Sequence, residues 1–148
     1  MQGFKHKLLA VMQHVVMVCQ GEVLLLRYSD YQGNSVAGLW GLPGGHYISG
    51  DPVDDLLREV REETGLQLPG RLELLKTYVV KFPDSFERFG VFYLYRMGAG
   101  PKPLINLSHE HTQFKWAGLS GIRNTSFIGP YHKEIVEAVL LKEREVII

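Results

Sequence analysis

The chain has 148 residues, 45% of them hydrophobic, and its 16 Lys and Arg balance 16 Asp and Glu. This length and composition predict one compact domain spanning residues 1–148. Because the net charge is zero, nothing indicates electrostatic capture of long nucleic acid or of an anionic membrane. The single cysteine, Cys19, excludes an internal disulfide framework and fits a reducing compartment.

The start of the chain is interrupted by Gln, His and Lys too often for a signal peptide. No uninterrupted run of about 18 apolar residues is present, so no membrane span is predicted. A soluble, cytoplasmic protein is therefore expected.

The predicted elements alternate between strands and helices. Residues 4–19 and 22–28 are aliphatic and predict a hairpin, with the second strand, EVLLLRY, buried on both faces. A polar loop and a short strand, Leu39–Leu42, lead into Pro43-Gly44-Gly45. Beyond a helix at 52–64, the pattern predicts strands at 71–82, 87–97 and 112–117, an irregular stretch at 119–127, and a helix at 131–143. Composition and periodicity therefore predict an α/β protein.

The helix at 52–64 has clear start and stop signals. Asp51 is a typical N-cap, Pro52 suits the first helical position, and Asp54 occupies the reciprocal slot of a capping box. Gly65 is placed to end the helix. A buried stripe is predicted at helical spacing from Val53, Leu56, Leu57 and Val60.

Acidic residues crowd the last turns of this helix. Glu59, Glu62 and Glu63 stand at i, i+3 and i+4, where like charges cost roughly 0.2–0.5 kcal/mol per pair. The helix dipole also disfavours anions near this end. Three carboxylates on one sector suit a hard divalent cation. The alternative is a solvated acidic face partnered by Arg58 and Arg61.

The whole stretch resembles the signature of the Nudix hydrolase family (MutT-like), G-x5-E-x7-R-E-U-x-E-E-x-G-U, where U is a bulky aliphatic residue. The lead-in Leu42-Pro43-Gly44-Gly45 also fits. The resemblance implies an α/β/α sandwich with a mixed sheet and a Mg²⁺ (or Mn²⁺) cofactor. It implies hydrolysis of a nucleoside diphosphate linked to another moiety, such as a nucleotide sugar, ADP-ribose or a (d)NTP. The matching positions are Arg58, Glu59, Val60, Glu62, Glu63, Gly65 and Leu66.

Family roles can be assigned to the matching residues. The resemblance makes Glu62 and Glu63 metal ligands, and it makes Glu59 a ligand or the group that handles the proton of the attacking water. Gly44 would add a backbone carbonyl to the metal shell. Arg58 would orient the carboxylates, although it could instead be a surface arginine paired with Asp54 at i−4.

The match has one departure. Counted back from Gly65, the first Glu of the signature falls on Gly50, and aligning the glycines instead brings Asp51 to that slot. In the family this Glu is mainly structural and pairs with the Arg. Asp51 lies about two turns from Arg58, so the two can share a helix face.

A second acid often comes from a later loop in this family, and Ser108–Thr112 looks like that segment. Glu110 is the candidate general base or extra ligand, with a solvated loop acid as the alternative. His109 and His111 flank Glu110 and raise a zinc interpretation. The lack of a third ligand nearby in sequence disfavours zinc.

The sequence indicates the substrate-contacting residues less clearly than the metal ligands. Gly45, beside the metal loop, and His46 could approach a phosphate, although a plain loop histidine is the favoured interpretation of His46. Trp40 and Trp116 lie in strand-like runs and are expected in the core. The residues that could face a nucleobase are Tyr31, Phe82, Phe127 and Tyr131.

The resemblance leaves the substrate open. Pro83 falls near the region that marks the substrate preference of family members. Its presence weakly indicates ADP-ribose or a related nucleotide sugar. The alternative function is a nucleotide-sensing module that binds without hydrolysis. Such domains usually lose signature carboxylates, and this chain retains all three on the helix. Homodimers are common among family members, so a homodimer is an open expectation.

Overall fold

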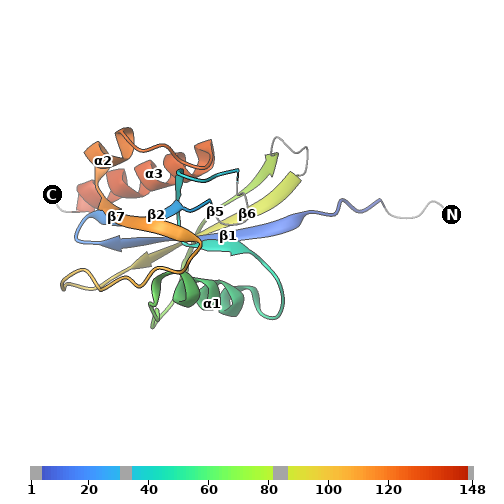
Figure 1. Cartoon of the computed structure of the whole chain (residues 1–148), viewed down its shortest axis with the longest axis horizontal. Coiled ribbons are helices and arrows are strands. Elements are labelled where there is room, and N and C mark those ends of the chain that lie inside the picture. Colours follow the sequence, from blue (N-terminus) through green and yellow to red (C-terminus); the bar gives the residue numbers. More distant parts are fainter. Residues whose placement is uncertain (1–4, 31–34, 82–86, 147–148) are drawn as a thin grey trace.

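The fold is three-layered, with a sheet between helices (Figure 1). A computed structural model describes residues 5–30, 35–81 and 87–146. One helix covers one face of the sheet and two helices cover the other (Figure 1). No helix in these ranges is both long and apolar enough to cross a membrane. The helices are α1 (Pro52–Thr64), α2 (Leu119–Arg123) and α3 (Pro130–Val146).

The sheet is mixed, as predicted. Its main path runs β3-β2-β1-β6-β5, while β4 pairs with β1 and β7 pairs with β2. The β1–β6 pair is parallel and the other pairs are antiparallel. The strands are β1 (Ala10–Cys19), β2 (Glu22–Tyr28), β3 (Trp40–Gly41), β4 (Gly44–His46), β5 (Glu73–Lys81), β6 (Glu87–Arg96) and β7 (His111–Ala117).

The two sides of the sheet have separate cores. Because side chains alternate along a strand, β2 contributes Leu24 and Leu26 to the α1 side and Val23 and Leu25 to the α3 side. The strand is therefore buried on both faces, as its apolar run predicted. Leu56 and Val60 of α1 complete one core. The α3 residues of the other core are Ile135, Val136, Val139 and Leu140.

The two tryptophans pack against the cores, as the sequence predicted. Trp40 packs against the α3-side core and Trp116 against the α1-side core. Cys19 is buried and free, as expected of an inert thiol. In β6, Phe92 belongs to the α3 side and Tyr93 to the α1 side, because side chains alternate along a strand.

Two local predictions were wrong, and one strand was not predicted. The predicted first strand begins only at Ala10, and residues 119–127 contain the short helix α2. A helix of five residues is too short to show a periodic apolar stripe. The glycines at 44–45 form a strand, β4, whose partner β1 lies far away in the sequence. Glycines carry no β pattern of their own, so only the tertiary contact reveals this strand.

Candidate functional site

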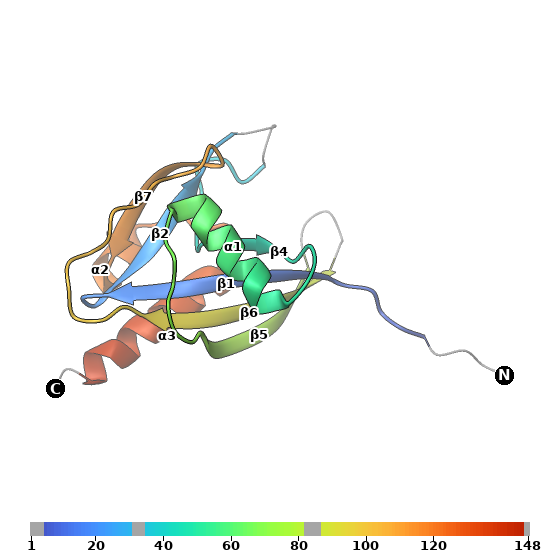
Figure 2. The ribbon, with the colours of Figure 1, turned by 90° about the horizontal axis from the view of Figure 1, so that it is seen from below.

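Helix α1 has the boundaries that its signals predicted. Asp51 caps it, with its carboxylate accepting the Asp54 amide at 3.0 Å. The amide of Gly65, whose φ is 77°, donates to the Arg61 carbonyl at 2.8 Å. Seen from below the sheet, α1 lies across β1 with β4 beside it (Figure 2). The acidic last turns are thereby positioned next to the glycine strand.

Gly44 brings β4 unusually close to β1. Its φ is 139°, and a Cβ at this position would lie 2.0 Å from the Gln13 carbonyl oxygen. The Gly44 amide donates to Glu63 Oε2 at 2.9 Å. Only glycine permits this approach, so β4 can hold the carboxylate of the buried Glu63. The suggested contribution of the Gly44 carbonyl to a metal shell stays a prediction.

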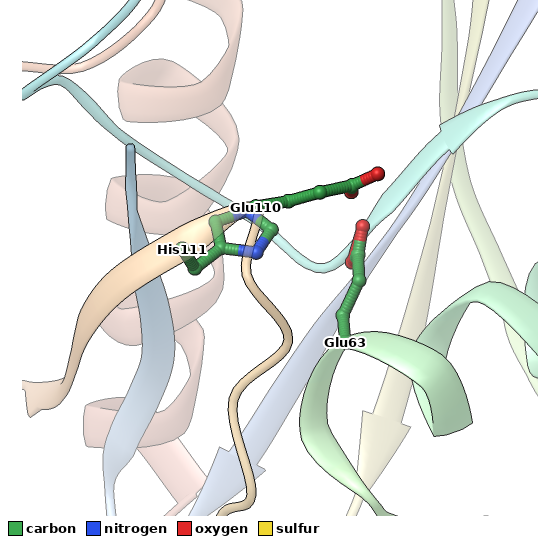
Figure 3. Close-up of side chains that lie close together, drawn as sticks. All are labelled: Glu63, Glu110 and His111. Carbon is green, nitrogen blue, oxygen red and sulfur yellow. The ribbon is translucent and has the colours of Figure 1, made fainter. Parts of the chain in front are cut away.

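Three side chains from distant segments meet beside this strand. One ligand atom from each of Glu63, Glu110 and His111 lies within 4.8 Å of the others. Glu63 projects from the end of α1, His111 is the first residue of β7, and Glu110 lies in the turn just before that strand (Figure 3). Glu63 and His111 are buried, and Glu110 is exposed. The fold therefore brings the later-loop acid Glu110 close to the signature helix, and its role as a base or extra ligand stays a prediction.

The electrostatics of this cluster favour a cation. Burial raises the pKa of Glu63 well above its usual value, and the charges of Glu59, Glu110 and Glu62 add to the shift. The hydrogen bond from Gly44 opposes it. Burial also raises the pKa of Glu59. Because the site disfavours its own negative charge, a divalent cation would relieve it, and the oxygen donors fit Mg²⁺ or Mn²⁺.

His111 is a neutral imidazole inside this anionic cluster. Only 5% of the residue is exposed, and burial lowers its pKa to about 4. Among the described residues, neither ring nitrogen has a hydrogen-bond partner. The ring packs against Tyr28, with centroids 4.8 Å apart. A nitrogen lone pair is therefore available at the site.

Arg58 binds three carboxylates along α1. It contacts Glu62 at 2.8 Å, Asp55 at 3.0 Å and Glu59 at 3.2 Å. These ion pairs neutralise part of the charge of the acidic side chains. The suggested role of Arg58 in orienting the carboxylates for metal binding stays a prediction. The Glu62 side chain is 57% exposed and lies outside the Glu63–Glu110–His111 group. Its role as a metal ligand stays a prediction.

Asp55 supplies the structural ion pair that the sequence assigned elsewhere. Asp55 is buried and accepts the Ile48 amide at 3.1 Å as well as Arg58. The Ile48 hydrogen bond, followed by that from Arg58, lowers the pKa of Asp55. The suggested partners of Arg58, Asp51 and Asp54, were therefore wrong. Asp51 caps the helix instead, because its position at the N-terminus satisfies a free amide.

Glu59 and Gly45 face each other across the gap between α1 and β4. A Cβ on Gly45 would lie 3.2 Å from Glu59 Oε2, so a larger side chain would press on the carboxylate. His46, the next residue, is exposed and accepts a hydrogen bond from Arg88 Nε at 3.2 Å. It lines a pocket of about 450 Å³ with Arg88. Its contact with phosphate stays a prediction.

Phe127 and Tyr131, two of the residues proposed to contact a nucleobase, pack against other side chains of the protein. Phe127 and Tyr131 are partly buried against the α3-side core, and the Tyr131 ring lies 4.3 Å from that of Tyr78. Phe127 also forms a β-bridge with Trp40. The structure does not bring either residue into the carboxylate cluster. Tyr31, Phe82 and Pro83 lie outside the described residues.

Sequence reasoning missed Asp55 and the role open to His111. Asp55 stands three residues before Arg58, a spacing that could have indicated an ion pair on one helix face. His111 was considered only together with His109, as part of a zinc motif. The structure brings His111, without His109, to the carboxylates. His111 is the first residue of β7, whereas His109 lies in the turn before that strand.

We predict that Asp55→Ala weakens Mg²⁺ binding about 10–100-fold, the usual cost of removing a residue that orients ligands. Arg58 would lose one partner, and the Ile48 loop would lose its anchor on α1. Isothermal titration calorimetry with Mg²⁺ measures the change. Asp54→Ala is the matched control, because Asp54 is exposed on the adjacent helical position. Equal affinities in the two variants would contradict a supporting role for Asp55.

Comparisons with known proteins agree with this geometry. A family model for the NUDIX domain matches residues 9–139. No curated protein matches the chain at a significant level. A MutT protein from Methanosarcina mazei Go1 is similar in structure, with 24% identity and a TM-score of 0.73, covering 96% of this chain and 99% of that one.

Two further solved structures are similar and hold ligands. The NUDIX domain of Shewanella oneidensis NrtR, complexed with ADP ribose, has 24% identity, a TM-score of 0.68 and coverages of 96% and 90%. A bifunctional NMN adenylyltransferase/ADP ribose pyrophosphatase from Francisella tularensis, complexed with AMP and a Mn ion, has 21% identity and a TM-score of 0.69. This chain is 93% covered in that match, which spans 42% of the bifunctional protein.

These structural likenesses show the shared fold, and the family model covers most of the chain, including the signature helix. The chain therefore belongs to the NUDIX domain family.

Proposed function

We propose that this Nudix pyrophosphohydrolase uses a divalent cation to hydrolyse a nucleoside diphosphate linked to another moiety. The observation that supports this most is the buried Glu63, held by the Gly44 amide and meeting Glu110 and His111. A buried carboxylate among other acids is costly unless a cation compensates it. Similar structures contain ADP ribose, or AMP with a Mn ion, which supports a nucleotide substrate.

The described residues fit a bound Mg²⁺ or Mn²⁺ ion. Glu59, Glu62 and Glu63 would hold it, with Gly44 and Glu110 completing the oxygen donors. When bound, such an ion neutralises diphosphate charge and lowers the pKa of a coordinated water. Glu62 would first have to leave Arg58, to which it is bonded at 2.8 Å.

The remaining chemistry falls to residues of the chain. Glu110 is exposed at the rim of the cluster; where it is not a ligand of the cation, its carboxylate can accept a proton from the attacking water. Glu59, whose pKa is raised by burial, is the other group suited to that role. Arg58 keeps Glu59 in place, and Gly44 does the same for Glu63. The two candidate bases differ in burial, which makes Glu110 the more accessible one.

A nucleotide panel tests the proposal. The protein is incubated with ADP-ribose, nucleotide sugars and canonical and oxidised (d)NTPs, each with Mg²⁺, Mn²⁺ or EDTA. We expect release of a nucleoside monophosphate, with phosphate or pyrophosphate where the substrate allows it, and none in EDTA. ADP-ribose or a nucleotide sugar should be the preferred substrate. Cleavage that persists in EDTA would contradict the metal-dependent mechanism.

A nucleotide-binding module is the second candidate. The observation that favours it is Arg58, which already binds Glu59 and Glu62 and so competes with a cation for two signature acids. Calorimetry on the same panel separates the two functions. Tight binding of a nucleotide with no cleavage of any panel member would favour the module.

A further inference from the structure

We infer that His111 is a nitrogen ligand of the bound cation and makes the site favour Mn²⁺ over Mg²⁺. Its partners in this ligand set are Glu63 and Glu110. The inference rests on the proposed function only in assuming that a cation binds at this cluster. It assigns His111 a role that the signature residues do not include.

The distances suit a single ion. Two ligands on opposite sides of an ion with bonds of about 2.1 Å are about 4.2 Å apart. One atom each of Glu63, Glu110 and His111 already lies within 4.8 Å of the others. Glu110 is exposed and has a long side chain, so it can close the remaining gap. Figure 3 shows the three side chains gathered at one point, with the imidazole lying toward Glu63.

The burial of His111 independently indicates a ligand. A buried polar side chain normally has a hydrogen-bond partner, and an exception calls for a missing ion or similar group. Both nitrogens of His111 lack a partner within the described parts of the chain, although only 5% of the residue is exposed. A cation would satisfy one of these nitrogens. The packing of Tyr28 against the ring keeps it in this position.

The donor set determines the metal preference. Carboxylates bind Mg²⁺ and Mn²⁺, whereas imidazole suits transition metals. A site with two carboxylates and one imidazole therefore binds Mn²⁺ more tightly, relative to Mg²⁺, than a site with oxygen donors alone. If His111 only donated a hydrogen bond to Glu63, removing it would weaken both metals alike.

Electron spin echo spectroscopy of the Mn²⁺-loaded protein, without substrate, tests the ligand directly. We expect modulation from a coordinated ¹⁴N nucleus, replaced by the ¹⁵N pattern after labelling with ¹⁵N-histidine. His111→Phe, which keeps a flat ring beside Tyr28, should lose this coupling. His109→Ala should retain it, because His109 lies outside the ligand group. A wild-type spectrum without nitrogen coupling, or no binding of Mn²⁺, would overturn the inference.

Displacement of Mn²⁺ by Mg²⁺, followed through the signal of free Mn²⁺, tests the preference. The ratio of Mn²⁺ to Mg²⁺ affinity should fall at least about tenfold in His111→Phe. His111→Gln serves as a second variant, and it should show the same loss if the first folds poorly by circular dichroism. An unchanged ratio in a folded variant would contradict the inference.

The test of the His111 ligand can fail while the proposed function holds, and the reverse is also possible. Nitrogen coupling with no hydrolysis of the nucleotide panel would support the ligand and contradict the enzyme. Hydrolysis without nitrogen coupling would do the reverse.

Discussion

Glu63→Gln should lower kcat at least about 100-fold, beyond the 10–100-fold typical of residues that only support a ligand. Glu63 is the buried member of the carboxylate group, and an amide there cannot supply the negative charge that a cation needs. The glutamine can still accept the Gly44 amide through its carbonyl oxygen, so the local backbone should persist. Steady-state kinetics with the preferred nucleotide and saturating Mg²⁺ measure the effect.

Glu62→Gln is the matched comparison, one residue away on the same turn. Its carboxylate is exposed and partly neutralised by Arg58, so we expect a smaller loss of about tenfold. If the two substitutions cost the same, Glu62 is an equal ligand, as the family signature implies. If Glu63→Gln kept wild-type turnover, the cation would not be bound at this cluster.

Although Glu63→Gln should lower kcat, it should raise the free energy of unfolding of the metal-free protein at alkaline pH. The pKa of Glu63 is raised in the folded protein, so ionising it there costs folding free energy. The stability of the metal-free wild type should therefore fall as the pH rises above the ordinary glutamate pKa. The glutamine variant lacks this dependence and should be the more stable protein at alkaline pH. Urea unfolding in EDTA at several pH values measures how the free energy of unfolding of the wild type and of the variant depends on pH.

Gly44→Ala should destabilise the fold by at least about 3 kcal/mol, at the upper end of the cost of overpacking. The added Cβ would lie 2.0 Å from the Gln13 carbonyl oxygen and 2.8 Å from the His14 Cα. Both atoms are backbone of the central strand β1, so no side-chain rotation relieves the clash. Urea unfolding followed by circular dichroism gives the free energy of unfolding.

Gly50→Ala is the control for this substitution. Gly50 also has positive φ, at 78°, but a Cβ there would meet nothing within 4 Å. The expected cost is only the strain of a left-handed residue, about 1–2 kcal/mol. A Gly44 variant no less stable than the Gly50 variant would mean that β4 can move away from β1, contrary to the close contact described.

The sequence predicted the elements with strong local signals. Helix α1 has a cap, a proline, a stripe and a terminal glycine, all local features, and it has the predicted boundaries. Strand β2 shows a continuous apolar run, and it is buried on both faces as expected. The short elements α2 and β4 have no such pattern, because their conformation depends on contacts with distant segments.

The sequence predicted the part of the site that lies on one face of helix α1. Spacing alone placed Glu59, Glu62 and Glu63 together, but it could not show that Arg58 holds two of them. Nor could it show that β7 brings His111 beside Glu63, since that contact joins segments more than forty residues apart. Asp55 was missed because its partner amide, from Ile48, belongs to a loop with no pattern.

The parallel pairing of β1 with β6 also constrains how the protein can be made. Ala10 lies opposite Arg88, and β2 has its longest partner in β7, near residue 117. A ribosome therefore releases the strongly apolar strands β1 and β2 long before their longest partners, β6 and β7, have been synthesised. Sheets dominated by such distant contacts form slowly, and exposed strands of this kind aggregate. We therefore expect β1 and β2 of the nascent chain to be prone to aggregation until β6 and β7 have been made.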